Sequence, residues 1–216
     1  MIVRIARSAD HLPAVRREVR VSRWLERVGF PAARVLDDVE QPLVVDGHPV
    51  TFWYRIDEGD RDATYGELGA VLRDLHALAV PDEPGLERLP VLGRTAVRME
   101  RAIGVPEDDL AFLRQRGREL EGLLSELRFE SPVGPLHGDA HTGNPIVDRA
   151  GRVFLIDLEN FCLDHPEWDL IVAAHEYHSL GWASSESYAD ISSERTVVTS
   201  ARGPVSRYCA QPRSSE

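Results

Sequence analysis

Apolar positions in the first quarter of the chain switch between strand-like runs and helical spacing. Short apolar or β-branched runs predict strands at residues 2–6, 34–36, 42–45 and 50–56. Between the first two, apolar side chains recur at helical spacing from Leu12 to Val28, which predicts an amphipathic helix that carries Glu18. Asp46 and Gly47 form a strong hairpin signal between the last two strands. The pattern predicts a small sheet with one helix.

A polar stretch at residues 57–63 interrupts this pattern and predicts a boundary between two lobes. Helices are predicted after it from the capping box at residues 64–67, at 106–127 and at 168–177. Short apolar runs predict strands that present loops at residues 133–136, 145–147 and 153–156. Beyond about Ser184 the chain is serine-rich without a clear period, and we expect poor order there. The predicted parts are an N-terminal lobe at 1–57, a largely helical lobe at 58–190 and a disordered tail at 191–216.

Composition narrows the choice of partners. The 216 residues include 25 basic and 36 acidic ones, and the net charge of −11 disfavours nucleic acid or an anionic membrane and favours a cationic substrate. All 25 basic residues are arginine, so arginine must perform any role that other enzymes give to lysine. The chain shows no signal peptide and only two cysteines, which indicates the cytoplasm. The oligomeric state is left open.

The densest group of reactive side chains lies in residues 137–144, His-Gly-Asp-Ala-His-Thr-Gly-Asn, followed by Asp157 and Glu159 after a predicted strand. Mg²⁺ prefers oxygen ligands and leaves room for substrate phosphates, which suits Asn144 and Asp157 together with Glu159. Asp139 precedes Asn144 by five residues. This is the spacing of phosphotransfer loops in which an Asp accepts the proton of the substrate hydroxyl and an Asn holds the metal.

Two other interpretations of this segment stay open. Asp139 and Asn144 could cap backbone groups of a plain loop, and Glu159 could stand behind the metal ligands rather than bind the metal. His137, Asp139, His141 and Asp157 could instead surround zinc or manganese in a metal-dependent hydrolase.

Several motifs together resemble the aminoglycoside phosphotransferase and choline kinase-like family, which is related to protein kinases. The motifs are His137-Gly138-Asp139 with Asn144, Ile156-Asp157-Leu158-Glu159, Pro166-Glu167-Trp168-Asp169-Leu170 and Leu75-His76-Ala77-Leu78. The resemblance covers roughly residues 1 to 190. It implies an α+β, two-lobed protein kinase-like fold with an incomplete N-lobe and a largely helical C-lobe that holds the catalytic loop and the metal site.

The resemblance also implies roles for single residues. Arg4 would contact the nucleotide phosphates and Glu18 would pair with it, although the two could also form a plain surface ion pair. Asp139 would be the catalytic base, and His137 and Asp169 would support its loop. The implied reaction transfers the γ-phosphoryl of ATP or GTP, with Mg²⁺, to a hydroxyl of a small molecule.

Two departures from the family pattern lead us to expect truncation at both ends. The phosphate-covering hairpin of the family precedes the strand that we place at residue 2, and a serine-rich tail replaces the closing helices. An inactive remnant that still binds nucleotide is therefore the main alternative to an active phosphotransferase.

Overall fold

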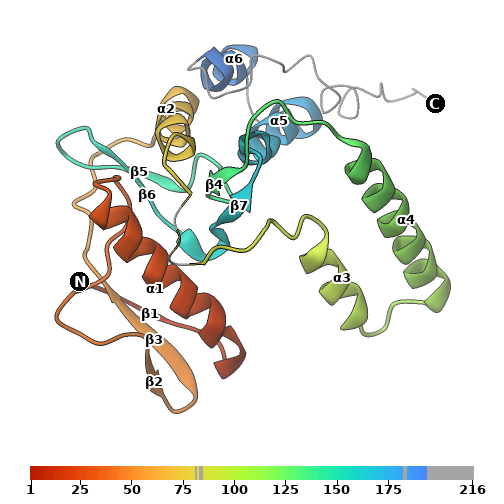
Figure 1. Cartoon of the computed structure of the whole chain (residues 1–216), viewed down its shortest axis with the longest axis horizontal. Helices are drawn as coiled ribbons and strands as arrows, with labels where there is room; N and C mark the ends of the chain where they lie inside the picture. The colour runs from red at the N-terminus through yellow and green to blue at the C-terminus, as the bar shows by residue number, and fades with distance from the viewer. Residues whose placement is uncertain (81, 83–84, 182–183, 194–216) are drawn as a thin grey trace. The chain divides into compact units, whose positions relative to one another are not determined.

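The computed structural model describes residues 1–80, 82, 85–181 and 184–193 (Figure 1). The chain divides into two compact units, one formed by Arg88–Glu130 and the other by the segments before and after it. The strands are β1 (Ile2–Ile5), β2 (Leu43–Val45), β3 (His48–Trp53), β4 (Gly134–Leu136), β5 (Pro145–Val147), β6 (Val153–Leu155) and β7 (Cys162–Asp164). The helices are α1 (Leu12–Arg27), α2 (Tyr65–His76), α3 (Gly93–Glu100), α4 (Glu107–Glu126), α5 (Ile171–His175) and α6 (Ser185–Ser193). The smaller unit contains α3 and α4.

The N-terminal sheet is antiparallel with strand order β1-β3-β2, and α1 runs alongside it (Figure 1). The buried face of α1 carries Trp24 and Leu25, which removes a broad apolar stripe from water. Ser22 of α1 donates to the carbonyl oxygen of Ala33 at 2.8 Å and accepts from the amide of Val35 at 3.1 Å. The predicted small sheet with one helix is confirmed.

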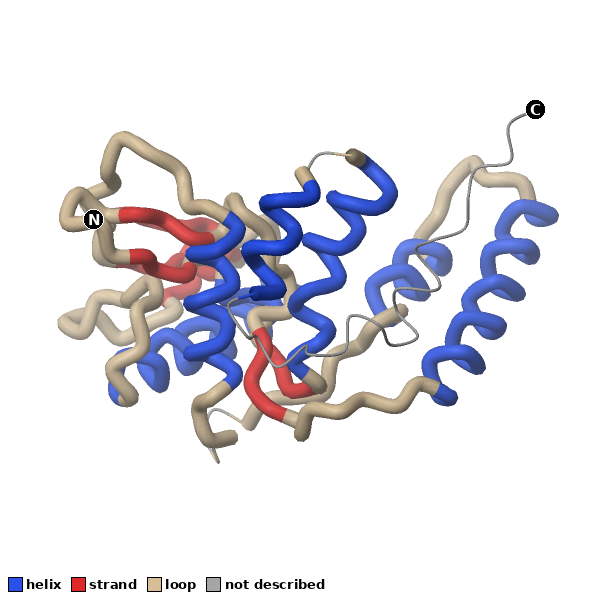
Figure 2. The backbone as a smooth tube through the Cα atoms, turned by 90° about the horizontal axis from the view of Figure 1, so that it is seen from above, coloured by secondary structure: helices blue, strands red, loops and turns tan. Residues whose placement is uncertain are grey.

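The remaining strands of the larger unit form two further antiparallel pairs, β4 with β7 and β5 with β6 (Figure 2). The predicted capping box starts α2, where Thr64 and Glu67 bond each other's backbone amides. The core of this unit joins α1, α2 and the chain after β6, and its larger members include Trp24, Leu68, Leu72, Leu75, Leu155, Leu158 and Phe161. Trp24 meets Phe161 edge-on with ring centroids 5.9 Å apart.

Two predicted elements differ in the structure. Residues 34–36 form no strand, and Val35 instead makes an isolated antiparallel bridge to Trp53. The predicted helix at 168–177 is divided into a 3₁₀ segment at Pro166–Leu170, the five-residue α5 and a π-helical turn at Glu176–Leu180. In the first of these pieces Asp169 is held by bonds to residues far away in the sequence, described below, and such tertiary contacts override the local helical period.

The sequence pattern did not predict α3, β7 and α6. α6 occupies residues for which poor order was expected, and it packs on α2 through buried Ile191. A Cβ at Gly69 of α2 would lie 3.0 Å from the carbonyl oxygen of Ile191, so the small residue permits this close approach. Residues 191–193 thus belong to a helix and not to the predicted tail. The rest of that tail, residues 194–216, lies outside the described residues.

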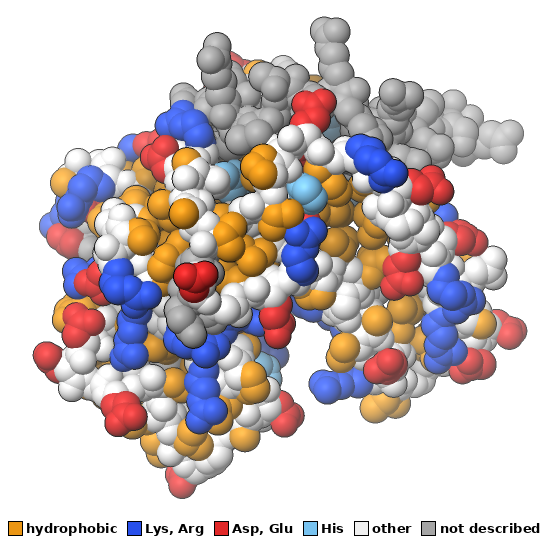
Figure 3. Space-filling model, in the orientation of Figure 1, with side chains coloured by type: hydrophobic (Ala, Val, Ile, Leu, Met, Phe, Trp, Pro, Cys, Tyr) orange, Lys and Arg blue, Asp and Glu red, His pale blue; other side chains and the backbone are white. Residues whose placement is uncertain are grey.

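Charged side chains of both signs are interspersed over the face shown in Figure 3. Within the described ranges, none of the helices has the length and apolarity needed to cross a membrane.

Candidate active site

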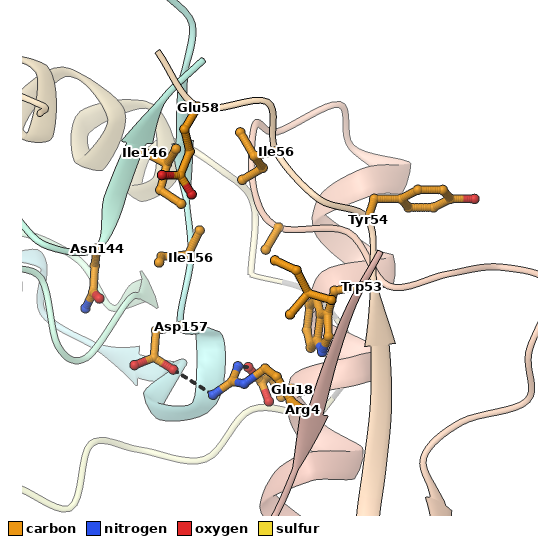
Figure 4. A pocket seen from close by; sticks show the side chains of 12 residues that line it. Arg4, Glu18, Trp53, Tyr54, Ile56, Glu58, Asn144, Ile146, Ile156 and Asp157 are labelled. Carbon is orange, nitrogen blue, oxygen red and sulfur yellow. Dashed lines mark hydrogen bonds and ion pairs between the residues drawn. The ribbon is translucent and has the colours of Figure 1, made fainter. Parts of the chain in front are cut away.

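A cavity of about 310 Å³ lies between the N-terminal sheet and the β5–β6 pair, within the larger unit (Figure 4). Its apolar lining consists of Ile2, Ala33, Trp53, Ile56, Ile146 and Ile156. Its polar lining includes Arg4, Glu18, Glu58, Asn144 and Asp157. In Figure 4, Glu58 lies near Ile146 at one end of the cavity, whereas Arg4, Glu18 and Asp157 gather at the other. The end that combines Arg4 with two acidic side chains is the charged end, and the opposite end carries one acidic side chain, Glu58.

Arg4 connects two elements at this charged end. Its position in β1, opposite Thr51 of β3, directs its side chain toward α1, where it forms an ion pair with Glu18. The other terminal nitrogen of the same guanidinium donates to Oδ1 of Asp157 at 3.1 Å. Arg4 also lies over the Trp53 ring, 5.9 Å from its centroid. A planar guanidinium with several donors can hold two carboxylates at once, so arginine suits this position.

The charged end holds more negative than positive charge. Burial raises the pKa of Glu18 to about 7, and the nearby negative charges of Asp157 and Glu159 add to this effect, although Arg4 opposes it. Burial alone would lower the pKa of Arg4, but Glu18 and Asp157 outweigh it and raise that pKa. One guanidinium thus lies among three acidic side chains, Glu18, Asp157 and Glu159. Such a surplus of acidic over basic side chains favours a bound cation.

Asn144 and Asp157 present suitable donor atoms for Mg²⁺. Asn144 is buried, and its Nδ2 donates to the carbonyl oxygen of Asp139 at 2.7 Å. This bond orients the amide, and its Oδ1 has no protein partner among the described residues. Asp157 follows β6 in the left-handed conformation, with φ 58° and ψ 58°. One amide oxygen and one carboxylate lining the same cavity fit a cation that keeps several waters and binds substrate phosphates.

Glu159 lies apart from these two candidate ligands. Its side chain is exposed and is not part of the cavity lining, while its carbonyl oxygen accepts from Arg17 of α1 at 3.0 Å. It is close enough to Arg4 and Glu18 to affect the pKa of both. Its predicted role as a metal ligand stays a prediction.

Asp139 occupies the loop between β4 and β5, next to Asn144 but outside the cavity lining. Its Oδ2 accepts a bond of 3.4 Å from Nδ2 of Asn160, which belongs to the turn that follows Asp157. The preceding residue, Gly138, has φ +79°, and a Cβ there would lie 2.3 Å from the carbonyl oxygen of Asn160. Only glycine permits this approach, so the backbones of the Asp139 loop and of the turn after Asp157 are in close contact.

A buried group of polar side chains holds the same loop from behind. Asp169 accepts from the backbone amides of His137 and Gly138 at 2.9 and 2.8 Å and from Nε2 of His76 at 2.9 Å. Burial alone would raise the pKa of Asp169, but the hydrogen bond and charge of His76, with the bond from Gly138, outweigh it and lower that pKa. Nε2 of His137 donates to the carbonyl oxygen of Ile156 at 2.8 Å.

The structure thus brings Arg4, Glu18, Asn144 and Asp157 to one cavity and ties Asp139 to it through Asn144. Sequence reasoning missed the contacts of His76 and Asn160. His76 belongs to the motif Leu75-His76-Ala77-Leu78, so a signal for it was present, whereas Asn160 carried none.

The hydrolase alternative loses support from this geometry. Among the described residues, no group of three or more His, Cys, Asp or Glu side chains is placed to hold a metal ion. His137, which that alternative requires as a ligand, is fully buried and bonds a backbone carbonyl instead.

A sequence model described as "Phosphotransferase enzyme family" matches residues 1–193. The chain belongs to this phosphotransferase enzyme family. The resemblance stated from the motifs is confirmed. No curated protein sequence matches the chain.

Solved structures confirm the α+β, protein kinase-like fold of this family member. An aminoglycoside-3′-phosphotransferase of type VIII matches with a TM-score of 0.65 and 20% identity, over 89% of this chain and 75% of that one. Aminoglycoside phosphotransferase APH(3'')-Id from Streptomyces rimosus matches with a TM-score of 0.64 and 19% identity, over 94% and 81%. An amicoumacin kinase in complex with AMP-PNP, Ca²⁺ and Ami matches with a TM-score of 0.62 and 17% identity, over 89% and 63%. The lobe boundary at residues 57–63 stays a prediction.

Proposed function

We propose that this phosphotransferase moves the γ-phosphoryl group of ATP or GTP to a hydroxyl of a small molecule. The observation that supports this most is the single cavity that combines an apolar wall with Arg4, Asn144 and Asp157. An apolar wall suits a nucleobase, and at the charged end Arg4 together with a bound metal ion would offset the negative charge of the phosphates. The net charge of −11 favours a cationic acceptor, such as an aminosugar or an amino alcohol.

Each residue has a separate task in the proposed reaction. Arg4 steadies the phosphates, and Glu18 holds Arg4 in place. Asn144 and Asp157 would hold Mg²⁺, with Glu159 close by, and the bound metal supplies neutralisation of phosphate charge. Asp139 orients the acceptor hydroxyl and accepts its proton as the hydroxyl oxygen bonds to the γ-phosphorus. The bond from that phosphorus to the bridging oxygen breaks, and the nucleoside diphosphate leaves.

His137 and Asp169 act behind this site in the proposed mechanism. Asp169 fixes the backbone of residues 137 and 138, and His137 ties the loop to the chain just before Asp157. Their task is to keep Asp139 at a constant position relative to the metal ligands. We also propose that the protein acts in the cytoplasm.

Transfer of labelled phosphate from ATP and from GTP to a panel of aminosugars and amino alcohols, with and without Mg²⁺, tests this function. Asp139→Asn should lower kcat by about a hundredfold or more, because it removes the base, and should leave nucleotide affinity unchanged. Asp157→Ala should weaken binding of the metal-nucleotide complex, because one ligand is lost. Asp74→Asn on the exposed side of α2 is the control and should match the unaltered protein.

Three results would contradict the proposal. They are transfer without Mg²⁺, full activity with Asn at position 139, and nucleotide binding without transfer to any acceptor in the panel. The last of these would identify the chain as the inactive remnant.

A further inference from the structure

The turn that contains Asn160 is rigidly anchored. Leu158 and Phe161 flank it and are 0% and 1% exposed, and Phe161 packs edge-on against Trp24 of α1. β7 begins directly after Phe161 and pairs with β4, the strand that leads into the Asp139 loop. Asn160 is therefore held at a fixed distance from that loop by packing on one side and strand pairing on the other.

Asn160 touches the Asp139 loop in two ways. Its Nδ2 donates to Oδ2 of Asp139 at 3.4 Å, and its carbonyl oxygen lies against Gly138, where no side chain would fit. The carbonyl oxygen of Asp139 is fixed separately by Asn144. Within the described part of the chain, Asp139 has no other side-chain partner, so its second carboxylate oxygen, Oδ1, is left available.

We propose that Asn160 is a positioning residue that sets the orientation of the Asp139 carboxylate. With its backbone held by Asn144 and one oxygen held by Asn160, the carboxylate can no longer rotate freely. Oδ1 is then the oxygen that meets the acceptor hydroxyl. A distance of 3.4 Å is long for a hydrogen bond, but such bonds often tighten when substrate binds. The inference rests on the proposed function only for the role of Oδ1.

The kinetic test compares variants that change the donor of Asn160. Asn160→Leu keeps the size and removes the donor, and Asn160→Asp keeps the shape but places an acceptor against the carboxylate. Both should lower kcat by about tenfold with little change in the KM of the nucleotide, because a misaligned base affects the chemical step. In an Asp139→Asn background, Asn160→Leu should cause no further loss.

Gln115 offers a matched control, because its Nε2 donates to Glu119 at 3.1 Å on α4. Gln115→Leu removes a similar amide–carboxylate bond and should leave kcat unchanged. Equal losses of kcat from Asn160→Leu with Asp or with Asn at position 139 would overturn the proposal. An unchanged kcat in both Asn160 variants would overturn it as well.

A second measurement does not depend on turnover and separates this inference from the proposed function. In NMR spectra of the protein without nucleotide, one side-chain amide proton of Asn160 should resonate downfield because it bonds a carboxylate. Asp139→Asn should move that signal upfield and leave the amide signals of Gln115 in place. A signal of Asn160 that stays unchanged in Asp139→Asn would overturn the positioning role, even if phosphoryl transfer is observed. A signal that moves would support the contact, even if no acceptor is found.

Discussion

Glu18 offers a quantitative test of how burial shifts the pKa of an acidic side chain at the charged end of the cavity. Its side chain is only 4% exposed, and burial raises its pKa from 4.5 to about 7 despite the ion pair with Arg4. The folded protein thus keeps a proton on Glu18 up to about pH 7, whereas the unfolded chain releases it near pH 4.5. Between these values the folded state binds more protons, so its stability falls as the pH rises.

The size of this effect follows from the difference between the two pKa values. It corresponds to about 3 kcal/mol of unfolding free energy, fully present below pH 4.5 and lost above pH 7. Gln at position 18 cannot titrate. We subtract the unfolding free energy of the unaltered protein from that of Glu18→Gln. This difference should therefore increase by up to about 3 kcal/mol from pH 5 to pH 8.

Urea unfolding at pH 5 and pH 8, without metal or nucleotide, measures this difference. Glu67→Gln is the control, because hydrogen bonds from Arg61 and Thr64 lower the pKa of Glu67 to about 2. Glu67 is then ionised in the folded state and mostly ionised in the unfolded chain across this range, so the effect of its replacement should differ little between the two pH values. If the effect of Glu18→Gln on the unfolding free energy is also the same at pH 5 and pH 8, burial does not raise the pKa of Glu18 as argued.

Two further predictions concern the Asp139 loop. Gly138→Ala should destabilise the protein by about 3 kcal/mol or more in urea unfolding, because a Cβ would overlap the carbonyl oxygen of Asn160 at a positive φ. Gly122→Ala on α4, where a Cβ meets nothing within 4 Å, should instead be neutral or stabilising. Asp169→Asn should cost about 3 kcal/mol, because one amide oxygen cannot serve the three donors that meet there. Hydrogen exchange at the amide of Gly138 should then become faster, and unchanged exchange would contradict this account.

The sequence predicted those parts of the fold in which local signals agree with tertiary packing. The capping box at Thr64 and the apolar period of α1 are examples, since the same side chains that favour the helix also form the core. α6 was not predicted because tertiary packing of Ile191 on α2 stabilises it. The serine-rich sequence itself shows no helical period of apolar residues. The helix predicted at 168–177 is broken for a related reason, because Asp169 bonds residues about 30 positions away.

Prediction of the site from the sequence had a similar limit. Motif spacing pointed to Asn144 and Asp157, and the structure places both in one cavity. The contact of Asn160 with Asp139 depends on how closely two backbone segments approach at Gly138, and no spacing along the chain encodes that distance. The same holds for the bond from His76 to Asp169, which joins residues 93 positions apart.

The left-handed backbone conformation of Asp157 restricts which substitutions are tolerated at this position during evolution. With φ 58° and ψ 58°, the position favours Gly, Asn and Asp and penalises β-branched side chains. If Asp157 holds Mg²⁺ as proposed, the residue at this position must also supply a side-chain oxygen, which removes Gly from that set. Under the proposed function, only Asp and Asn would satisfy both the backbone conformation and the metal ion, and a mutation to any other residue would lose one of the two.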